Sequence, residues 1–480
     1  MTLLHILFFV IAAALLGTVA RGRWRGWLML GVSVLAIYWL GSVSPIRALD
    51  FWLPTAVLAL TALVWAATYS ASATPDGLPW PANETWITAA VVVGLVMAVA
   101  LLRYVPVLCC ITPSPPPGFP AVALALITVS GATLLVKRLL PGARAAIVAL
   151  IGLLIGLLVV LKYEPLGTAA SAVLRALSAQ SVERASALDV RWLGFSYVAF
   201  RLLHLLLDRL AGRLPALSLR EALTYAIFFP AFTAGPIDRV ERFVKDLRAP
   251  FTLTLPAAFE GGRRIVIGLF RKFVLADGLA LIALNAQNAT QTTSALWMWV
   301  LLYAYAFRLY LDFAGYTDIA IGLGLLMGIR LPENFQRPYL KPNLTAFWNA
   351  WHITLAQWVR TYVFNPFTRA LRANPRGIPT ALIIAVGQMI TMTLIGLWHG
   401  ITWNFVIWGV WHGVGLFIHN RWTNAMRVPL RRLEERPGLK RLYTVASVLF
   451  TFHYVLLGWV WFALPTVDLA KAVFVRLFGG

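Results

Sequence analysis

The feature that most constrains the fold is a series of long apolar segments that recurs through the whole chain. A helix of roughly 20 apolar residues crosses the hydrocarbon core of a bilayer, and many of these segments approach that length. Of the 480 residues, 60% are hydrophobic and only 12% are charged, too few to cover a soluble protein of this size. The sequence therefore predicts an all-α polytopic membrane protein.

Twelve segments are candidate spans. Two or three of them are expected to be short, tilted or re-entrant, which predicts about ten to twelve transmembrane helices. The first follows the N-terminus without a preceding basic region, so it is interpreted as a transmembrane helix rather than a signal peptide. The ranges are 3–20, 27–43, 51–68, 86–107, 119–136, 146–161, 191–207, 264–284, 294–314, 378–398, 401–419 and 442–464.

The net charge of +22 is concentrated in short connections between the apolar segments. This pattern is typical of cytoplasmic loops that face an anionic leaflet, and it argues against nucleic-acid binding. The connection at 106–117 is rich in proline and almost uncharged, so it is predicted to lie outside. Residues 69–85 carry no Lys or Arg, although the alternation of spans places them inside. The adjacent Cys109 and Cys110 suggest neither a disulfide framework nor a zinc site.

The chain changes character near residue 190. Before it, the apolar segments contain few polar residues; after it, ionisable residues enter them repeatedly, and such residues usually face a cavity or one another. The predicted division is therefore 1–190 for N-terminal transmembrane helices, 191–464 for a core that carries the function and 465–480 for a short tail. Two segments of the core are unsuited to simple spans. Residues 228–236, which include Pro236, suggest a re-entrant segment. Residues 345–364 suggest one aromatic helix that lies at the interface or dips into the core.

Among seven histidines, His399 is the strongest candidate for chemistry. It ends an apolar segment inside the sequence GLWHG (396–400), where a neutral imidazole in an aromatic environment can act as a base. His352 follows an aromatic stretch and is predicted to line a substrate passage. His412 repeats the Trp-His-Gly pattern, and His412 and His419 could offer two metal ligands. No cluster of acids accompanies them, so no metal site is predicted. The remaining histidines, His5, His204 and His453, are interpreted as structural.

Three charged residues in an apolar helix offer an alternative interpretation. Asp312 follows Arg308 by four residues, a spacing that suits an intrahelical ion pair. Asp318 is predicted to brace a break between helices. A transporter would instead use Arg308, Asp312 and Asp318 as its polar pathway. The sequence contains neither a phosphate-binding loop nor a GxSxG elbow, which argues against ATPases and serine hydrolases.

Several ordered blocks resemble the membrane-bound O-acyltransferases, in the bacterial branch that includes the alginate O-acetylase membrane subunit and the teichoic-acid D-alanyl transferase. The blocks are DFAGYTDIAIGLGLLMGIR (312–330), PENFQRPYLK (332–341), AFWNAWHITLAQWVR (346–360) and GLWHGITWNFVIWGVWHG (396–413), supported by residues 193–201 and 228–246. The family's two marked histidines correspond to His352 and His399. Two positions depart from the family pattern. Thr361, which follows Arg360, stands where the family often has Asp, and Ala350 stands where it often has Arg.

The resemblance implies a central funnel or tunnel among the helices of a bacterial inner-membrane protein, with no bound cofactor. An acyl thioester, acetyl-CoA or an acyl-carrier protein, would enter from the cytoplasm. The acceptor would be a hydroxyl of a cell-envelope polysaccharide, polymer or carrier, and an extracytoplasmic transferase partner would complete the transfer. His399 would be the general base, while His352 would position the donor or relay a proton. The predicted lining residues are Trp398, Asn349, Trp351, Asn404 and Trp403.

Overall fold

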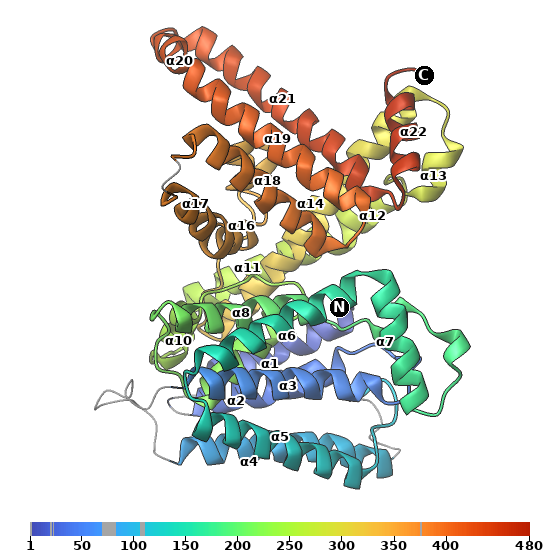
Figure 1. Ribbon diagram of the computed structural model, residues 1–480, viewed down its shortest axis with the longest axis vertical. Helices are drawn as coiled ribbons and strands as arrows, with labels where there is room; N and C mark the ends of the chain where they lie inside the picture. The colour runs from blue at the N-terminus through green and yellow to red at the C-terminus, as the bar shows by residue number, and fades with distance from the viewer. Residues whose placement is uncertain (1, 20–21, 23, 70–82, 106–110, 375–376) are drawn as a thin grey trace. The chain divides into compact units, whose positions relative to one another are not determined.

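The computed structural model describes residues 2–19, 22, 24–69, 83–105, 111–374 and 377–480 (Figure 1). Helices make up 77% of the protein, and the described residues contain no β-strand. An isolated antiparallel bridge joins Phe335 to Trp351. This content confirms the all-α class. Cys109, Cys110 and most of the connection at 69–85, which carries no Lys or Arg, lie outside the described residues.

The chain divides into two compact units, one of residues 1–265 and 319–332 and the other of residues 266–318 and 333–480. The long helix α14 (Ala295–Leu326) belongs to the second unit up to residue 318 and to the first unit beyond it. This division reflects only which residues pack against one another. The functional boundary predicted near residue 190 stays a prediction.

The first unit is built from helices that pack side by side. Helix α3 packs against α5, α6, α8 and α9, and α2 packs against α9. The helices are α1 (Leu3–Val19), α2 (Trp24–Trp39), α3 (Leu49–Thr68), α4 (Glu84–Leu101), α5 (Phe119–Leu139), α6 (Arg144–Lys162), α7 (Glu164–Leu177), α8 (Phe195–Leu210), α9 (Leu219–Ile227), α10 (Val240–Arg248) and the first part of α11 (Leu255–Leu269).

The second unit begins with the end of α11 and a π-helical segment, η7 (Phe270–Ala276), and it includes most of α14. Helix α18 packs along α19, and α19 packs along α21 (Figure 1). Its other helices are α12 (Asp277–Ala280), α13 (Ala286–Gln291), α15 (Leu344–Trp348), α16 (Ile353–Val359), the π-helical η9 (Arg360–Phe364), α17 (Asn365–Arg372), α18 (Thr380–His399), α19 (Trp403–Ala425), α20 (Arg427–Glu434), α21 (Pro437–Ala463) and α22 (Val467–Leu477). Helix α22 occupies most of the predicted C-terminal tail.

Each of the twelve predicted spans overlaps a helix. Seven described helices are long and apolar enough to cross a membrane, namely α3, α4 with its extension to Tyr104, α5, α6, α14, α18 and α21. Helix α1 is apolar but has only 17 residues. Length and composition thus support a multi-pass protein, while the full number of ten to twelve spans stays a prediction.

A buried arginine supports the irregular segment at 228–236, which follows α9. The Arg201 guanidinium donates hydrogen bonds to the carbonyl oxygens of Ala226 at 2.9 Å, Ala231 at 2.6 Å and Pro236 at 3.5 Å. Only 2% of Arg201 is exposed. Backbone groups freed by a break in a buried helix need such partners, because an unsatisfied carbonyl away from water is costly. The segment is largely buried in protein. Its re-entrant placement in the membrane stays a prediction.

Glycines allow α18 and α19 to approach closely. A Cβ added at Gly409 of α19 would lie 2.5 Å from the Cα of Thr393 and 2.6 Å from the carbonyl oxygen of Met392, both on α18. Real Cβ atoms do not come this close, so a larger side chain would force the two helices apart. The close packing also fixes the position of α18, which ends at His399.

We expect Gly409→Val to destabilise the protein by about 1 to 3 kcal/mol or more, because overpacking at a helix contact displaces backbone. The measurement is the melting temperature of the purified protein in detergent. Gly94→Val in α4 is the matched control, because a Cβ there meets no atom within 4 Å. Equal melting temperatures for the two variants would contradict the close contact between α18 and α19.

Candidate active site

His352 lies in a break between α15 and α16. Its backbone adopts the left-handed conformation, with φ 44° and ψ 52°. The single aromatic helix predicted for 345–364 is therefore wrong. The reason is a neighbouring strand-like segment: the amide of Gln336 donates to the carbonyl of Ala350 at 2.9 Å, and the amide of Ile353 donates to the carbonyl of Asn334 at 3.0 Å. These bonds replace helical ones at the break.

Asn334 orients the His352 ring. The side-chain oxygen of Asn334 accepts hydrogen bonds from the amide of Thr354 at 3.2 Å and from the Thr354 hydroxyl at 2.9 Å. It also lies 3.2 Å from Nδ1 of His352. Because the amide of Thr354 can only donate, this atom of Asn334 must be the oxygen. Nδ1 of His352 therefore carries the proton, which leaves Nε2 as the basic nitrogen.

Burial keeps the His352 imidazole uncharged. Only 3% of the residue is exposed, as is 0% of Asn334. Burial lowers the pKa of the His352 imidazole to about 3, because charging the ring away from water is unfavourable. The residue lies outside the seven helices that could span the membrane. At neutral pH it is therefore a neutral imidazole with a fixed tautomer.

Asn334 was not predicted as a site residue, and its role leads to a test. For the acyl-transfer activity that the family resemblance implies, we expect Asn334→Ala to cause a loss of about 10- to 100-fold, since a misoriented imidazole at His352 would lose part of the 10²- to 10⁴-fold that acid–base catalysis supplies. Asn334→Asp keeps an acceptor at this position and should retain more activity than the alanine variant. The readout is turnover of the membrane-inserted protein at several pH values. Equal losses in both variants would show that Asn334 acts only through packing.

His399 ends α18 and is surrounded by aromatic rings. Its ring centroid lies 4.6 Å from that of Trp398, 4.7 Å from Phe462 and 5.9 Å from each of Phe405 and Trp408. Gly396, one turn earlier in α18, has no room for a side chain, because a Cβ would collide with the carbonyl oxygen of Phe405. The aromatic environment predicted for His399 is therefore present, and tight packing holds it in place.

Trp398 connects the two histidines. Its ring lies 6.1 Å from the ring of His352 and 4.6 Å from that of His399. The structure thus brings both predicted histidines against one indole. Phe313, at 4.7 Å from His352, and Phe462 complete the aromatic walls. Neither phenylalanine could be recognised from sequence, since α14 and α21 supply them from distant parts of the chain.

The remaining predicted lining residues occupy different positions. Trp351 is buried beside Trp459, with ring centroids 5.1 Å apart. The Asn404 amide donates to the carbonyl of Leu464 at 2.7 Å and so ties α19 to the end of α21. Trp403 is 75% exposed, and Asn349 accepts a hydrogen bond from Arg360 at 2.6 Å. Contact of these four residues with substrate stays a prediction.

The charged residues of α14 have partners that the sequence did not predict. The carboxylate of Asp312 pairs with the ammonium of Lys272, not with Arg308, and Asp318 pairs with Arg271. Gly315 has no side chain, so α14 can lie close to the backbone of Gly268 and Lys272. This close approach brings Lys272 beside Asp312. Helix α14 also continues through Asp318, so the predicted break at that residue is wrong. The transporter interpretation of Arg308, Asp312 and Asp318 stays untested.

A cavity of about 220 Å³ lies in the same unit, lined by Trp348, Arg360, Gln388 and Thr391 among other residues. Trp348 also contacts Trp408, at 5.7 Å between ring centroids, and Trp408 contacts His399. Three polar atoms near the cavity have no hydrogen-bonding partner in the described protein: Nε1 of Trp348, Oε1 of Gln388 and Oγ1 of Thr391. The lining of the cavity therefore combines polar and apolar side chains.

Comparison with known proteins identifies the family. The sequence model of MBOAT, the membrane-bound O-acyltransferase family, matches residues 143–461. The chain belongs to this family. The matched region contains His352, His399, Asn334 and the cavity. Membership confirms the class of enzyme predicted from the sequence, an O-acyltransferase in a multi-pass membrane protein.

Relatives in the MBOAT family include enzymes with different named acceptors. A teichoic acid D-alanyltransferase from Streptococcus thermophilus is 34% identical over 285 residues, covering 57% of this chain and 68% of that protein. A probable alginate O-acetylase AlgI from Azotobacter vinelandii is 35% identical over 288 residues, covering 60% and 53%. A peptidoglycan O-acetyltransferase from Helicobacter pylori is 34% identical over 273 residues, covering 55% and 48%. The chain thus spans about half the length of the two acetylating relatives.

Proposed function

We propose that this MBOAT protein transfers a small acyl group, acetyl or similar, from a cytoplasmic thioester to a hydroxyl of a cell-envelope polymer. The proposal rests on the contact of His352 and His399 with the same indole, that of Trp398. The tautomer of His352 is fixed by Asn334, and His399 is surrounded by aromatic rings. Acyl transfer from a thioester requires a base and a site that excludes water. The thiol is already a good leaving group, so the reaction needs no nucleotide.

In this mechanism His399 removes the proton from the acceptor hydroxyl as the oxygen attacks the thioester carbonyl. The tetrahedral intermediate then collapses, the carbon–sulfur bond breaks, and the thiolate receives a proton as it leaves. His352 contacts the same indole as His399, and its fixed tautomer supports a role in positioning the donor or relaying that proton. The aromatic walls favour direct transfer, because water would otherwise hydrolyse the thioester.

The cavity beside Trp348 suits the arm of the acyl donor. Coenzyme A and acyl-carrier proteins present the thioester on the same pantetheine arm, which carries two amides. Amide carbonyls could accept from the Trp348 indole and the Thr391 hydroxyl, while an amide N–H could donate to Gln388. Arg360 lines the same cavity and would suit a phosphate at its entrance. This match supports a pantetheine-linked donor without distinguishing coenzyme A from a carrier protein.

The named substrates of the relatives support an acceptor in the cell envelope, since they are teichoic acid, alginate and peptidoglycan. Under this proposal the protein lies in a bacterial inner membrane. An acyl-carrier protein is a candidate partner on the cytoplasmic side, and a transferase outside would receive or place the acyl group. The basic connections predicted to be cytoplasmic would suit an acidic carrier.

The test compares envelopes of cells that make the protein with envelopes of cells that lack it. Mild alkali releases ester-linked acids, which mass spectrometry identifies. We expect a short-chain acid, acetate or a similar group, to appear only when the protein is present. Identical acid profiles at confirmed membrane levels of the protein would contradict the proposed function.

A further inference from the structure

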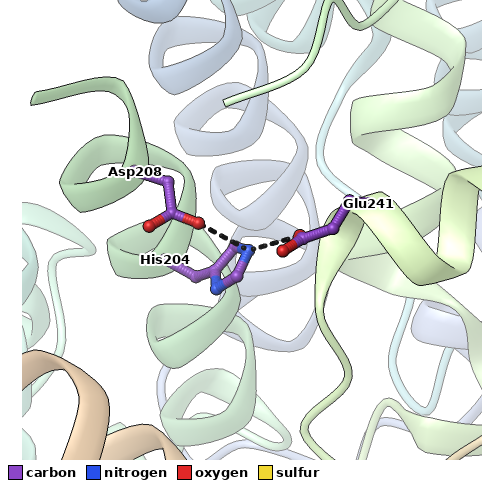
Figure 2. A group of neighbouring side chains, drawn as sticks. All are labelled: His204, Asp208 and Glu241. Atoms are coloured by element: carbon purple, nitrogen blue, oxygen red, sulfur yellow. Dashed lines mark ion pairs between the residues drawn. The ribbon is translucent and has the colours of Figure 1, made fainter. Parts of the chain in front are cut away.

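Three side chains of the first unit meet between α8 and α10 (Figure 2). Nε2 of His204 lies 3.5 Å from Oδ2 of Asp208 and 3.4 Å from Oε2 of Glu241. The side chains of His204 and Asp208 are 1% and 5% exposed, whereas that of Glu241 is 46% exposed. Within the described residues, this is the one group of three or more His, Cys, Asp or Glu whose ligand atoms all lie within 4.8 Å of one another.

The local structure explains why the three side chains converge. His204 and Asp208 are four residues apart on α8, so they lie on the same face of the helix, one turn apart. Glu241 lies in the first turn of α10. Both carboxylates point at the same nitrogen of the imidazole (Figure 2). The group could not be recognised from the sequence, because Glu241 lies on α10 whereas His204 and Asp208 lie on α8.

The distances are compatible with the spacing of ligand atoms around a metal ion. Hydrogen bonds between nitrogen and oxygen are usually about 2.7 to 3.2 Å long, shorter than both separations. Ligand atoms about 2.1 Å from a tetrahedral Zn²⁺ ion lie about 3.4 Å from one another. The two separations from Nε2 therefore equal the edges of such a coordination shell.

A backbone contact indicates that Nε2 presents its lone pair. The amide of Val240 donates to Nε2 of His204 at 3.4 Å, a long hydrogen bond that a cation could replace. In this tautomer the imidazole proton is on Nδ1. A lone pair and two carboxylate oxygens then face one point, an arrangement that a cation would stabilise.

The surroundings resemble those of bound metals. The other oxygen of Asp208, Oδ1, accepts a hydrogen bond from Arg213 at 2.8 Å, which leaves Oδ2 facing the imidazole. Metal-binding carboxylates are commonly held in this way through a second interaction. Glu241 also lines a surface pocket of about 390 Å³ together with Lys245 and Arg248. Glu241 is therefore the member of the group that can be reached from the surface.

We propose that His204, Asp208 and Glu241 bind a divalent first-row metal ion, with Zn²⁺ as the best match, and that the ion joins α8 to α10. One imidazole and two carboxylates are ligands that Zn²⁺ accepts. The segment between these helices contains the irregular backbone held by Arg201. A metal at this point would therefore stabilise the fold of the first unit rather than take part in acyl transfer.

The test uses the full-length protein in detergent, purified without a histidine tag and stripped with EDTA. On addition of ZnCl₂, we expect one tightly bound zinc per chain and a rise in melting temperature on the order of 5 °C. MgCl₂ should have little effect, because Mg²⁺ prefers oxygen ligands and keeps its water. Glu241→Gln should weaken zinc binding by at least about 10-fold, the lower end of what loss of even an outer-shell partner costs.

Two further variants separate a metal site from a simple ion pair. Glu241→His replaces one zinc ligand with another and should restore binding, whereas an ion pair with His204 would not be restored. Glu260→Gln removes an exposed carboxylate that pairs with Arg263 and should leave zinc binding unchanged. Zinc binding that is equally weak in the wild type and in Glu241→Gln would overturn the proposal. The contacts of His204 with Asp208 and Glu241 would then be ion pairs without a metal.

Discussion

Replacement of His399 with alanine is expected to lower acyl transfer by at least about 100-fold, since general acid–base catalysis supplies 10² to 10⁴ in rate. The imidazole is the basic group within the aromatic walls formed by Trp398, Phe405, Trp408 and Phe462. The alanine variant removes the base but keeps the helix, because alanine has a high helix propensity. Turnover of thioester by membranes that contain equal amounts of each protein measures the effect.

The matched control for this prediction is His5→Ala. His5 belongs to α1 in the first unit, where its ring interacts with Thr2 and Trp39. It should retain activity near that of the wild type. An active His399→Ala variant would show that His399 is structural. Comparable losses in both variants would indicate a general effect of removing a histidine from a membrane helix.

Replacement of Arg201 with alanine is expected to cause the largest loss of stability, about 3 to 5 kcal/mol. The substitution leaves the carbonyls of Ala226, Ala231 and Pro236 without their charged donor in a buried region. It also leaves a cavity where a large side chain was fully enclosed. The melting temperature of the purified protein and its yield as a monodisperse species report the change.

Arg209→Ala provides the control on the same helix, because Arg209 is only partly buried near the end of α8. Its loss should cost about 1 kcal/mol or less. Arg201→Lys should fall between the two, since one ammonium cannot reach all three carbonyls in the geometry of a guanidinium. Similar melting temperatures for Arg201→Ala and Arg209→Ala would contradict the role assigned to Arg201.

The helical framework could be predicted because bilayer length imposes a strong pattern on sequence. Each of the twelve apolar ranges overlaps a helix, including those at 119–136 and 146–161, which correspond to α5 and α6. Helix ends were less predictable. The segment at 294–314 extends through α14 to Leu326, because Asp318 pairs with Arg271 and does not interrupt the helix. A carboxylate in an apolar segment does not reveal its partner on another helix.

The site was predictable only in part. His352 and His399 were identified through family motifs. The helix break at His352 was missed because it results from backbone hydrogen bonds to residues 334–336, which are distant in the sequence. Asn334 lies within the motif at 332–341. Only the contacts of its side chain with His352 and Thr354 show that it orients the His352 ring. The His204 group likewise depends on a contact between α8 and α10. Such contacts leave no local pattern in composition or periodicity.

The most direct test of the proposed mechanism is the amount of envelope-linked ester in cells that make the wild-type protein, the His399→Ala variant or neither, at matched membrane levels. We predict ester only with the wild type, at a level that falls to background in the variant. Ester restored fully by His399→Ala would contradict the assignment of His399 as the base. An equal amount of ester in all three would contradict the proposed acyl transfer to the envelope.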